Sequence, residues 1–158
     1  MAIALITGTS SGIGLATTIA LARAGHTIVA TMRDPDSAGE LARLIAADHL
    51  PVQMIALDVD DDASVAQAFK AALDQYGRID VLVNNAGINR PGSVEETPLE
   101  SFRQIMETNY FGSLRCIQAV LPHMIARRAG CIVNISSVAG RIALAPQSAY
   151  VASMRLKV

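Results

Sequence analysis

Short apolar runs alternate along the chain with segments in which apolar residues recur every three or four positions. Short runs of this kind are typical of strands buried in a parallel sheet, and the wider spacing is typical of amphipathic helices. The predicted strands are 2–7, 27–32, 52–57, one within 79–87, and 131–136, and the predicted helices are 13–24, 37–48, 61–76, 97–128 and one that begins near 150. Because strands that alternate with helices form right-handed β-α-β units, we expect an α/β fold with a parallel sheet in a single domain, residues 1–158.

The start of the long helix at 97–128 carries recognisable helix-starting residues. Thr97 is the predicted N-cap, Pro98 the first helical position, and Glu100 the residue that reaches back to complete a capping box. Pro122 lies inside the same pattern, so we expect the helix to bend there.

The composition narrows the possible classes of protein. Of the 158 residues, 51% are hydrophobic and 17% are charged, which suits a buried sheet and excludes a disordered chain. The net charge of −1 gives no basic face for nucleic acid. Cys116 and Cys131 lie in apolar runs and the histidines are isolated, so neither a disulfide scaffold nor a metal site is expected. No signal peptide or membrane-spanning run is recognisable, so we expect a cytoplasmic protein.

The first predicted strand runs directly into the sequence TGTSSGIG, residues 7–14, which we call the glycine loop, and then into a helix. Gly8 permits a tight turn, Gly12 allows a pyrophosphate to approach closely, and Gly14 allows the helix to pack on the strand. The helix would then present free N–H groups and its positive dipole end to phosphate. The loop lacks the Gly-Lys-Ser/Thr of a P-loop. An ordinary glycine-rich turn is the alternative, which the flanking strand and helix disfavour.

Further motifs follow the glycine loop in a fixed order. The full set is TGTSSGIG at 7–14, LDV at 57–59, NNAG at 84–87, NYFG at 109–112, VNISSVAG at 133–140, and Tyr150. In this order and spacing they resemble the short-chain dehydrogenase/reductase (SDR) family. The resemblance spans nearly the whole chain and implies a doubly wound parallel sheet (Rossmann fold) with strand order 3-2-1-4-5. It also implies a nicotinamide dinucleotide cofactor, a small carbonyl or alcohol substrate, and assembly into a homo-oligomer, either a dimer or a tetramer.

The resemblance also implies a role for each matching position. The implied cofactor-binding residues are Gly8, Ser10, Gly12, Ile13, Gly14, Asp58, Val59, Asn84, Ala86 and Gly87. The implied catalytic residues are Asn109, which would hold a water-linked proton relay, Ser137, which would bind the substrate oxygen, and Tyr150, which would be the acid/base. Asp58 would accept a hydrogen bond from the adenine amino group, with Val59 beside it. Ser137 is chosen over Ser136 because it lies thirteen residues before Tyr150.

Purely structural roles remain open for several of these polar residues. Asn84 or Asn85 could bond a turn backbone. Asn109 could be a satisfied polar group inside a helix, and Ser136 and Ser137 could cap the end of a strand. The functional assignment therefore rests on the whole constellation rather than on any single residue.

The residues after the second predicted strand bear on the choice of nicotinamide cofactor. An NAD enzyme places an acidic residue there, which binds the ribose 2′-hydroxyl. Here that position is Met32, and Arg33 follows, whose guanidinium can bind a 2′-phosphate with two parallel hydrogen bonds. Asp34 is the rival acidic residue, but it precedes Pro35 and favours a turn. We therefore expect NADP, bound through Arg33, in preference to NAD.

Tyr150 lacks the neighbour that the resemblance implies. In the family a lysine four residues after the tyrosine binds the nicotinamide ribose and lowers the tyrosine pKa, but here that residue is Met154. Moving a tyrosine pKa from about 10 to near 7 takes ~4 kcal/mol, and one cation ~5 Å away at an effective dielectric constant of ~20 supplies roughly 3 kcal/mol. Arg155 points elsewhere on the helix, and Lys157 is expected on a similar face but ~4.5 Å further along. We expect neither to replace the lysine, so the chain should be inactive.

The chain also ends soon after Met154, whereas family members continue with another strand, a substrate loop and further helices. The C-terminal strands of the fold are therefore expected to be missing. The methionine and the early end together favour a shifted reading frame or a damaged gene end. A fragment boundary alone would explain the end but not the methionine.

By lineage we expect an NADP-dependent carbonyl reductase or alcohol dehydrogenase. One alternative is a catalytically dead fragment that still binds a dinucleotide. Another is an interaction or oligomerising remnant that uses the helix at 97–128. The last predicted strand, 131–136, is expected to be a bare, uncharged sheet edge that could pair with another chain.

Overall fold

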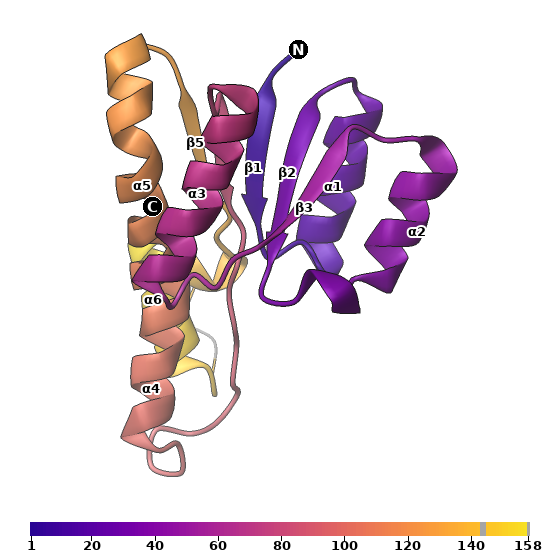
Figure 1. Cartoon of the computed structure of the whole chain (residues 1–158). Coiled ribbons are helices and arrows are strands. Elements are labelled where there is room, and N and C mark those ends of the chain that lie inside the picture. The colour runs from indigo at the N-terminus through magenta and orange to yellow at the C-terminus, as the bar shows by residue number, and fades with distance from the viewer. Residues whose placement is uncertain (143–144, 158) are drawn as a thin grey trace.

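The computed structural model describes residues 1–142 and 145–157. Its centre is a parallel sheet of five strands in the order β3-β2-β1-β4-β5 (Figure 1). The strands are β1 (Ile3–Thr7), β2 (Thr27–Met32), β3 (Val52–Ala56), β4 (Val81–Asn84) and β5 (Cys131–Asn134). The chain builds the sheet outward from β1 in one direction and then returns to β4 on the other side. This order confirms the doubly wound sheet that the sequence predicts.

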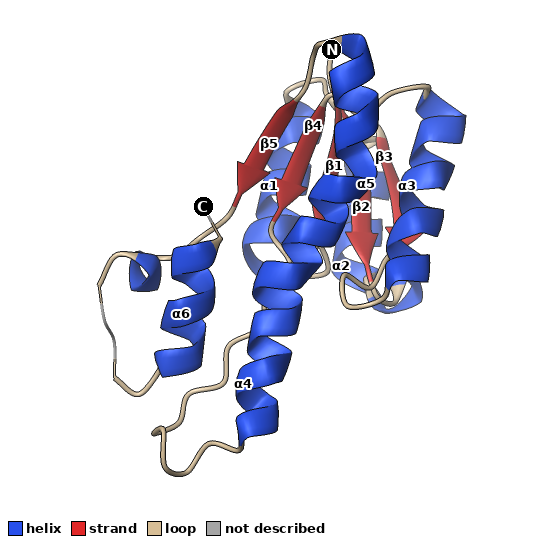
Figure 2. Ribbon diagram, turned by 90° about the vertical axis from the view of Figure 1, so that its left-hand side faces the viewer, coloured by secondary structure: helices blue, strands red, loops and turns tan. Residues whose placement is uncertain are grey.

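Helices cover both faces of the sheet (Figure 2). On one face lie α1 (Gly12–Arg23) and α2 (Gly39–Asp48), and on the other lie α3 (Asp62–Tyr76) and α5 (Gly112–Arg127). Ile6 and Ile28 belong to the apolar core under α1 and α2, whereas Leu5 and Val29 belong to the core under α3 and α5. Successive side chains of a strand point to opposite faces, so continuous apolar runs are needed to fill both layers.

The helix predicted at 97–128 is divided into two. α4 (Leu99–Met106) is followed by a π-helical turn, η2 (Glu107–Phe111), and then by α5. The π turn places Asn109 in the protein interior, and such turns occur frequently at functional sites. The interruption therefore lies well before Pro122, which is inside α5.

The predicted capping box at the start of this helix is wrong. The N-cap is Pro98, whose ψ of 141° is extended, and no side chain caps the helix. The Thr97 hydroxyl instead donates to the carbonyl oxygen of Ser93 at 2.7 Å, and Glu100 pairs with Arg103 on the helix surface. Threonine hydroxyls readily bond to nearby backbone groups. Here the hydroxyl bonds to the preceding turn, so it does not cap the start of the helix as the pattern predicted.

β5 forms one edge of the sheet, although it ends at Asn134 rather than at residue 136. Cys131 is exposed and Val133 is 39% exposed, so this edge offers apolar as well as backbone groups to solvent. The chain continues through a short turn, η3 (Val138–Gly140), to α6 (Ser148–Leu156), which lies beside α4 and away from the sheet (Figure 2). Pairing of the β5 edge with another chain stays a prediction.

Within residues 1–142 and 145–157, no helix is long and apolar enough to cross a membrane. The same residues contain no group of His, Cys, Asp and Glu side chains that is arranged to hold a metal ion.

Candidate functional site

The glycine loop, residues 7–14, joins the end of β1 to the start of α1 in a very small space. Gly8 has a φ of 70°, which favours glycine, and a Cβ there would lie 2.9 Å from the Cα of Ala86. A Cβ on Gly14 would lie 2.2 Å from the carbonyl oxygen of Gly8 and 2.5 Å from Nδ2 of Asn85. The two glycines therefore permit a close approach of loop, helix and β4 that a larger residue would prevent.

Asn85 holds the glycine loop in place. Its Nδ2 donates to the carbonyl oxygens of Thr7 and Gly8, both at 2.9 Å. In return, the backbone N–H groups of Asn85 and Ala86 donate to the Thr7 hydroxyl at 3.0 Å. Asn85 thus has the turn role that the sequence left open for one of the two asparagines, and it also lines the groove described below.

Asn84, which the resemblance assigns to the cofactor, is buried beneath this site. It is 1% exposed, and its Nδ2 donates to Oδ1 of Asn134 on β5 at 2.9 Å. Neighbouring residues at the end of a strand point to opposite sides, so only one of two consecutive asparagines can face the groove. The alternation of the strand is the signal that could have distinguished them.

The start of α1 has free hydrogen-bond donors. Ser11 is the N-cap, but its side chain caps no N–H group, and the first turn contains no acidic residue. The first N–H groups of any helix have no partner within the helix, so those of Gly12, Ile13 and Gly14 remain available to an anion. Gly12 has a φ of 56° and no heavy atom within 4 Å of the position of a Cβ, so the space beside it is open.

A mostly polar groove of about 470 Å³ runs along the carboxyl ends of β1 to β4. Open α/β sheets bind ligands at this edge, where the strand order reverses. The predicted cofactor residues in its lining are Gly8, Ser10, Ile13, Gly14, Arg33, Asp58, Val59, Ala86 and Gly87, whereas Gly12 and Asn84 lie outside it. Asn85, for which the sequence left a turn role open, also lines it, and so do residues that the sequence did not single out: Ser11, Asp60, Arg90, Gln104 and Thr108.

Arg33 and Asp34 have different surroundings at the end of β2. Arg33 is exposed and lines the groove. Asp34 does not line it; its Oδ1 accepts a hydrogen bond from the N–H of Asp36 at 3.1 Å and caps a short 3-10 turn, η1 (Pro35–Ser37). The turn chemistry expected of Asp34 is therefore what the structure shows, and Arg33 is the charged residue that faces the groove at this point.

The three candidate catalytic residues lie outside the groove lining. Asn109 is fully buried, and its side chain accepts from the N–H of Ile88 at 2.7 Å and donates to the Ile88 carbonyl oxygen and to Oγ of Ser153. It therefore ties the end of β4 to α6. Ser137 accepts from the N–H of Ala139 and caps η3. Tyr150 is half-buried on α6, and among the described residues its hydroxyl has no hydrogen bond to Ser137.

Met154 and Lys157, at the end of the chain, are both buried. Met154 is buried, 3% exposed, and its carbonyl oxygen accepts from the Ser136 hydroxyl at 2.8 Å. α6 ends at Leu156, and Lys157 turns into the interior, where it is 4% exposed and its Nζ donates to the carbonyl oxygen of Ala86 at 2.8 Å.

The burial of Lys157 has an electrostatic consequence. It lowers the pKa of the lysine from 10.5 to about 8, an effect that nearby Cys116 partly opposes. The Lys157 ammonium group thus bonds the backbone of Ala86, a residue that lines the groove, and the burial of this lysine was not recognisable from the helical pattern.

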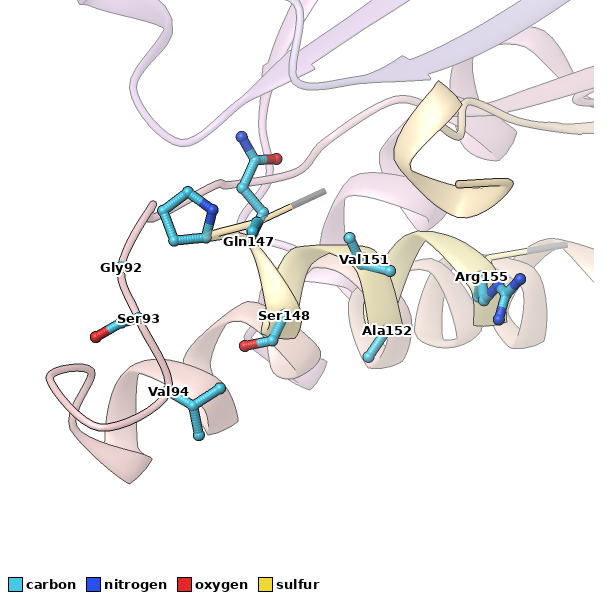
Figure 3. Close-up of a pocket in the computed structure, with 10 residues that line it drawn as sticks. Gly92, Ser93, Val94, Gln147, Ser148, Val151, Ala152 and Arg155 are labelled. Carbon is cyan, nitrogen blue, oxygen red and sulfur yellow. The ribbon is translucent and has the colours of Figure 1, made fainter. Parts of the chain in front are cut away.

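A second cavity, of about 670 Å³, lies on the outer side of α6 (Figure 3). Ser148, Ala152 and Arg155 face it from one side of the helix, and Val94 faces it from the loop before α4. Tyr150 is not part of its lining, although the next residue, Val151, is. The cavity is mainly apolar and contains none of the candidate catalytic or cofactor residues.

Comparison with known proteins identifies the family. The profile of the short chain dehydrogenase family matches residues 2–154, almost the whole chain. The chain belongs to the short-chain dehydrogenase family. The relatives reported below are named as an oxidoreductase and as dehydrogenases.

Individual relatives are identical to this chain at about two fifths of the aligned positions. An uncharacterized oxidoreductase, YusZ, of Bacillus subtilis is 40% identical over 153 residues, which cover 96% of this chain and 54% of the relative. The 2-(R)-hydroxypropyl-CoM dehydrogenase of Xanthobacter autotrophicus is 40% identical over 157 residues, 96% of this chain and 62% of the relative.

A solved relative shows the same fold. The crystal structure of a gluconate 5-dehydrogenase from Burkholderia cenocepacia, in complex with NADP and tartrate, superposes with a TM-score of 0.91 at 36% identity, covering 98% of this chain and 61% of that one. The chain therefore spans about half to three fifths of the length of the proteins it matches.

Proposed function

We propose that this chain is the dinucleotide-binding part of an NADP-dependent oxidoreductase that exchanges a hydride with a carbonyl or alcohol substrate. The observation that carries the proposal is the polar groove, where the glycine loop, the uncapped start of α1 and Arg33 surround one space. The similarity to a gluconate 5-dehydrogenase that was crystallised with NADP supports the choice of cofactor.

The residues of the groove fit a dinucleotide phosphate. The open space beside Gly12 and the free N–H groups of the first turn of α1 suit a pyrophosphate. Arg33 would bind the 2′-phosphate, and Asp58 would accept a hydrogen bond from the adenine amino group. Ala86 and Gly87 would line the cofactor at the end of β4.

The candidate catalytic residues would manage the proton and the substrate oxygen. When bound, reduced nicotinamide supplies a hydride to the carbonyl carbon of the substrate. The Ser137 hydroxyl would donate a hydrogen bond to the carbonyl oxygen, and the Tyr150 phenol would donate the proton that converts this oxygen to a hydroxyl. In the reverse direction Tyr150 would accept that proton. Asn109 would hold β4 and α6 in register through its contacts with Ile88 and Ser153.

A second candidate function is cofactor binding without turnover, and two observations favour it for the chain as it stands. The position of the family lysine is taken by the buried Met154, whose side chain carries no charge. Lys157 does not substitute for that lysine, because its ammonium group is bonded to the carbonyl oxygen of Ala86.

We expect the purified chain to bind NADPH, measured by the change in nicotinamide fluorescence, and to reduce a panel of ketones and aldehydes no faster than background. Met154→Lys alone should not restore turnover, because it adds a charge while the groove lining still includes none of the candidate catalytic residues. Turnover that disappears in Tyr150→Phe would contradict the expected inactivity. Failure of the wild type to bind either NADPH or NADH would overturn the proposed function.

A further inference from the structure

Arg115 of α5 joins three segments that meet beside the groove. Its Nε donates to Oδ1 of Asp62, at the start of α3, at 2.5 Å, and its NH2 group donates to Oε1 of Glu107 in the π turn. Its NH1 group donates to the carbonyl oxygen of Val59 at 3.2 Å. The Arg115 side chain is only 24% exposed, whereas the Asp62 carboxylate is 87% exposed. One guanidinium therefore uses all its nitrogens to tie α3, the π turn and the strand-end loop together.

The loop from Asp58 to Asp62 is held by further hydrogen bonds on either side of the Val59 carbonyl oxygen that Arg115 contacts. The Thr108 hydroxyl donates to Oδ2 of Asp60 at 2.7 Å. The N–H of Asp60 donates to Oδ1 of Asp58 at 3.1 Å, which fixes the orientation of the Asp58 carboxylate.

Close packing and burial accompany these hydrogen bonds. A Cβ on Gly112 would lie 2.7 Å from Cγ2 of Val59, so α5 and the loop pack without free space. Burial and the nearby carboxylates of Asp58 and Glu107 raise the pKa of Asp60, whereas the bond from Thr108 and the charge of Arg115 act in the opposite direction. Arg115 thus also offsets the mutual repulsion of the acidic groups at this end of the groove.

From this geometry we infer that Arg115 is a positioning residue for the adenine end of the cofactor site: it holds the Asp58–Val59 loop so that the Asp58 carboxylate can receive the adenine amino group. The inference rests on the proposed function, because it assumes that the groove binds a dinucleotide. It adds to that function a residue outside the groove lining, Arg115, that determines how well the site recognises the adenine base.

The test compares NADPH with reduced nicotinamide hypoxanthine dinucleotide phosphate, in which an oxygen replaces the adenine amino group. We expect wild-type protein to bind NADPH about fivefold more tightly than this analogue, the value of one net hydrogen bond. In Arg115→Met the ratio should fall to below about twofold, because the loop no longer holds Asp58 in place. Arg115→Lys should retain an intermediate ratio. Arg103→Met is the matched control, since Arg103 is an exposed α4 residue that pairs with Glu100 on the surface of the same helix.

The ratio of the two affinities distinguishes a positioning role of Arg115 from a general effect on the stability of the protein. Partial unfolding of Arg115→Met would weaken both ligands equally and leave the ratio unchanged, and that result would overturn the inference. A wild type that binds both dinucleotides equally would also overturn it, because Asp58 would then not read the amino group. If the wild type bound neither, the proposed function itself would fail.

Discussion

Replacing Lys157 by methionine is expected to stabilise the protein at pH 7 by about 2 kcal/mol. Burial lowers the pKa of Lys157 from 10.5 to about 8, and a difference of this size corresponds to roughly 3 kcal/mol that disfavours the folded state while the lysine is charged in both states. Methionine has a similar length and carries no charge. It forfeits the bond to the Ala86 carbonyl oxygen, which is worth ~1 kcal/mol, so the net gain is smaller than the whole electrostatic cost.

The effect of Lys157→Met on stability should depend on pH, because the pKa of Lys157 is lower in the folded state. Below pH 8 the folded and unfolded states both hold the proton, and the cost is present in full. Between pH 8 and about 10.5 the folded state releases the proton while the unfolded state keeps it, so the stability of the wild type rises with pH. The advantage of Lys157→Met should therefore shrink over this range and reverse near its upper end.

Urea unfolding of both proteins at pH 7, 8.5 and 10 would measure the effect. Lys70→Met is the control, because Lys70 is an exposed α3 residue that pairs with Asp74 one turn along the same helix, and it should change stability by less than ~0.5 kcal/mol at every pH. Equal stability of the wild type and Lys157→Met at pH 7 would show that Lys157 is not buried as a cation.

Replacing Gly14 by alanine is expected to destabilise the protein by about 2–4 kcal/mol and to abolish NADPH binding. The added Cβ would lie 2.2 Å from the Gly8 carbonyl oxygen and 2.5 Å from Nδ2 of Asn85. Either the helix moves away from β1 or the glycine loop loses the bonds that Asn85 makes with it. Both changes move the N–H groups that we assign to the pyrophosphate.

Gly39→Ala provides the matched control for Gly14→Ala. Gly39 begins α2, and no heavy atom lies within 4 Å of the position of its Cβ. Alanine is the better helix former by ~1 kcal/mol, so this change should be neutral or stabilising and should leave NADPH binding intact. Urea unfolding and NADPH titration of both variants would decide the matter. A Gly14→Ala protein with wild-type stability and affinity would contradict the close packing of the loop.

Most of the sheet could be predicted from the sequence because its strands are buried on both faces. The strand predicted at 27–32 has these bounds in the structure, and the strand predicted at 2–7 begins one residue later, at Ile3. The π turn at Glu107–Phe111 could not be predicted, because a single extra residue hardly disturbs a spacing of three and four. The role of the Thr97 hydroxyl was predicted wrongly for a related reason. It could cap the following helix or bond to the preceding turn, and only the path of the backbone shows that it bonds to the turn.

The candidate site was predictable where the backbone dictates the residue type and less so where side-chain direction matters. Gly8 and Gly14 are needed by contacts of 3 Å or less that any Cβ would make. The choice between Asn84 and Asn85 depended on which one faces the groove; the motif alone does not encode that direction, although the alternation of side chains along β4 could have indicated it. Lys157 was expected along a continuing helix, whereas the helix ends one residue earlier and the lysine turns inward.

The central claim is that the groove binds NADP through Arg33, and titration of NADPH and NADH against the wild type and Arg33→Ala tests it most directly. We expect the wild type to bind NADPH about tenfold or more tightly than NADH, because a two-pronged, charge-assisted contact with the 2′-phosphate is worth at least ~1.4 kcal/mol. Arg33→Ala should lose this preference while its affinity for NADH stays unchanged, and the exposed α2 residue Arg43, replaced by alanine, should have no effect. Equal affinities in the wild type, or an undiminished preference for NADPH in Arg33→Ala, would contradict the claim.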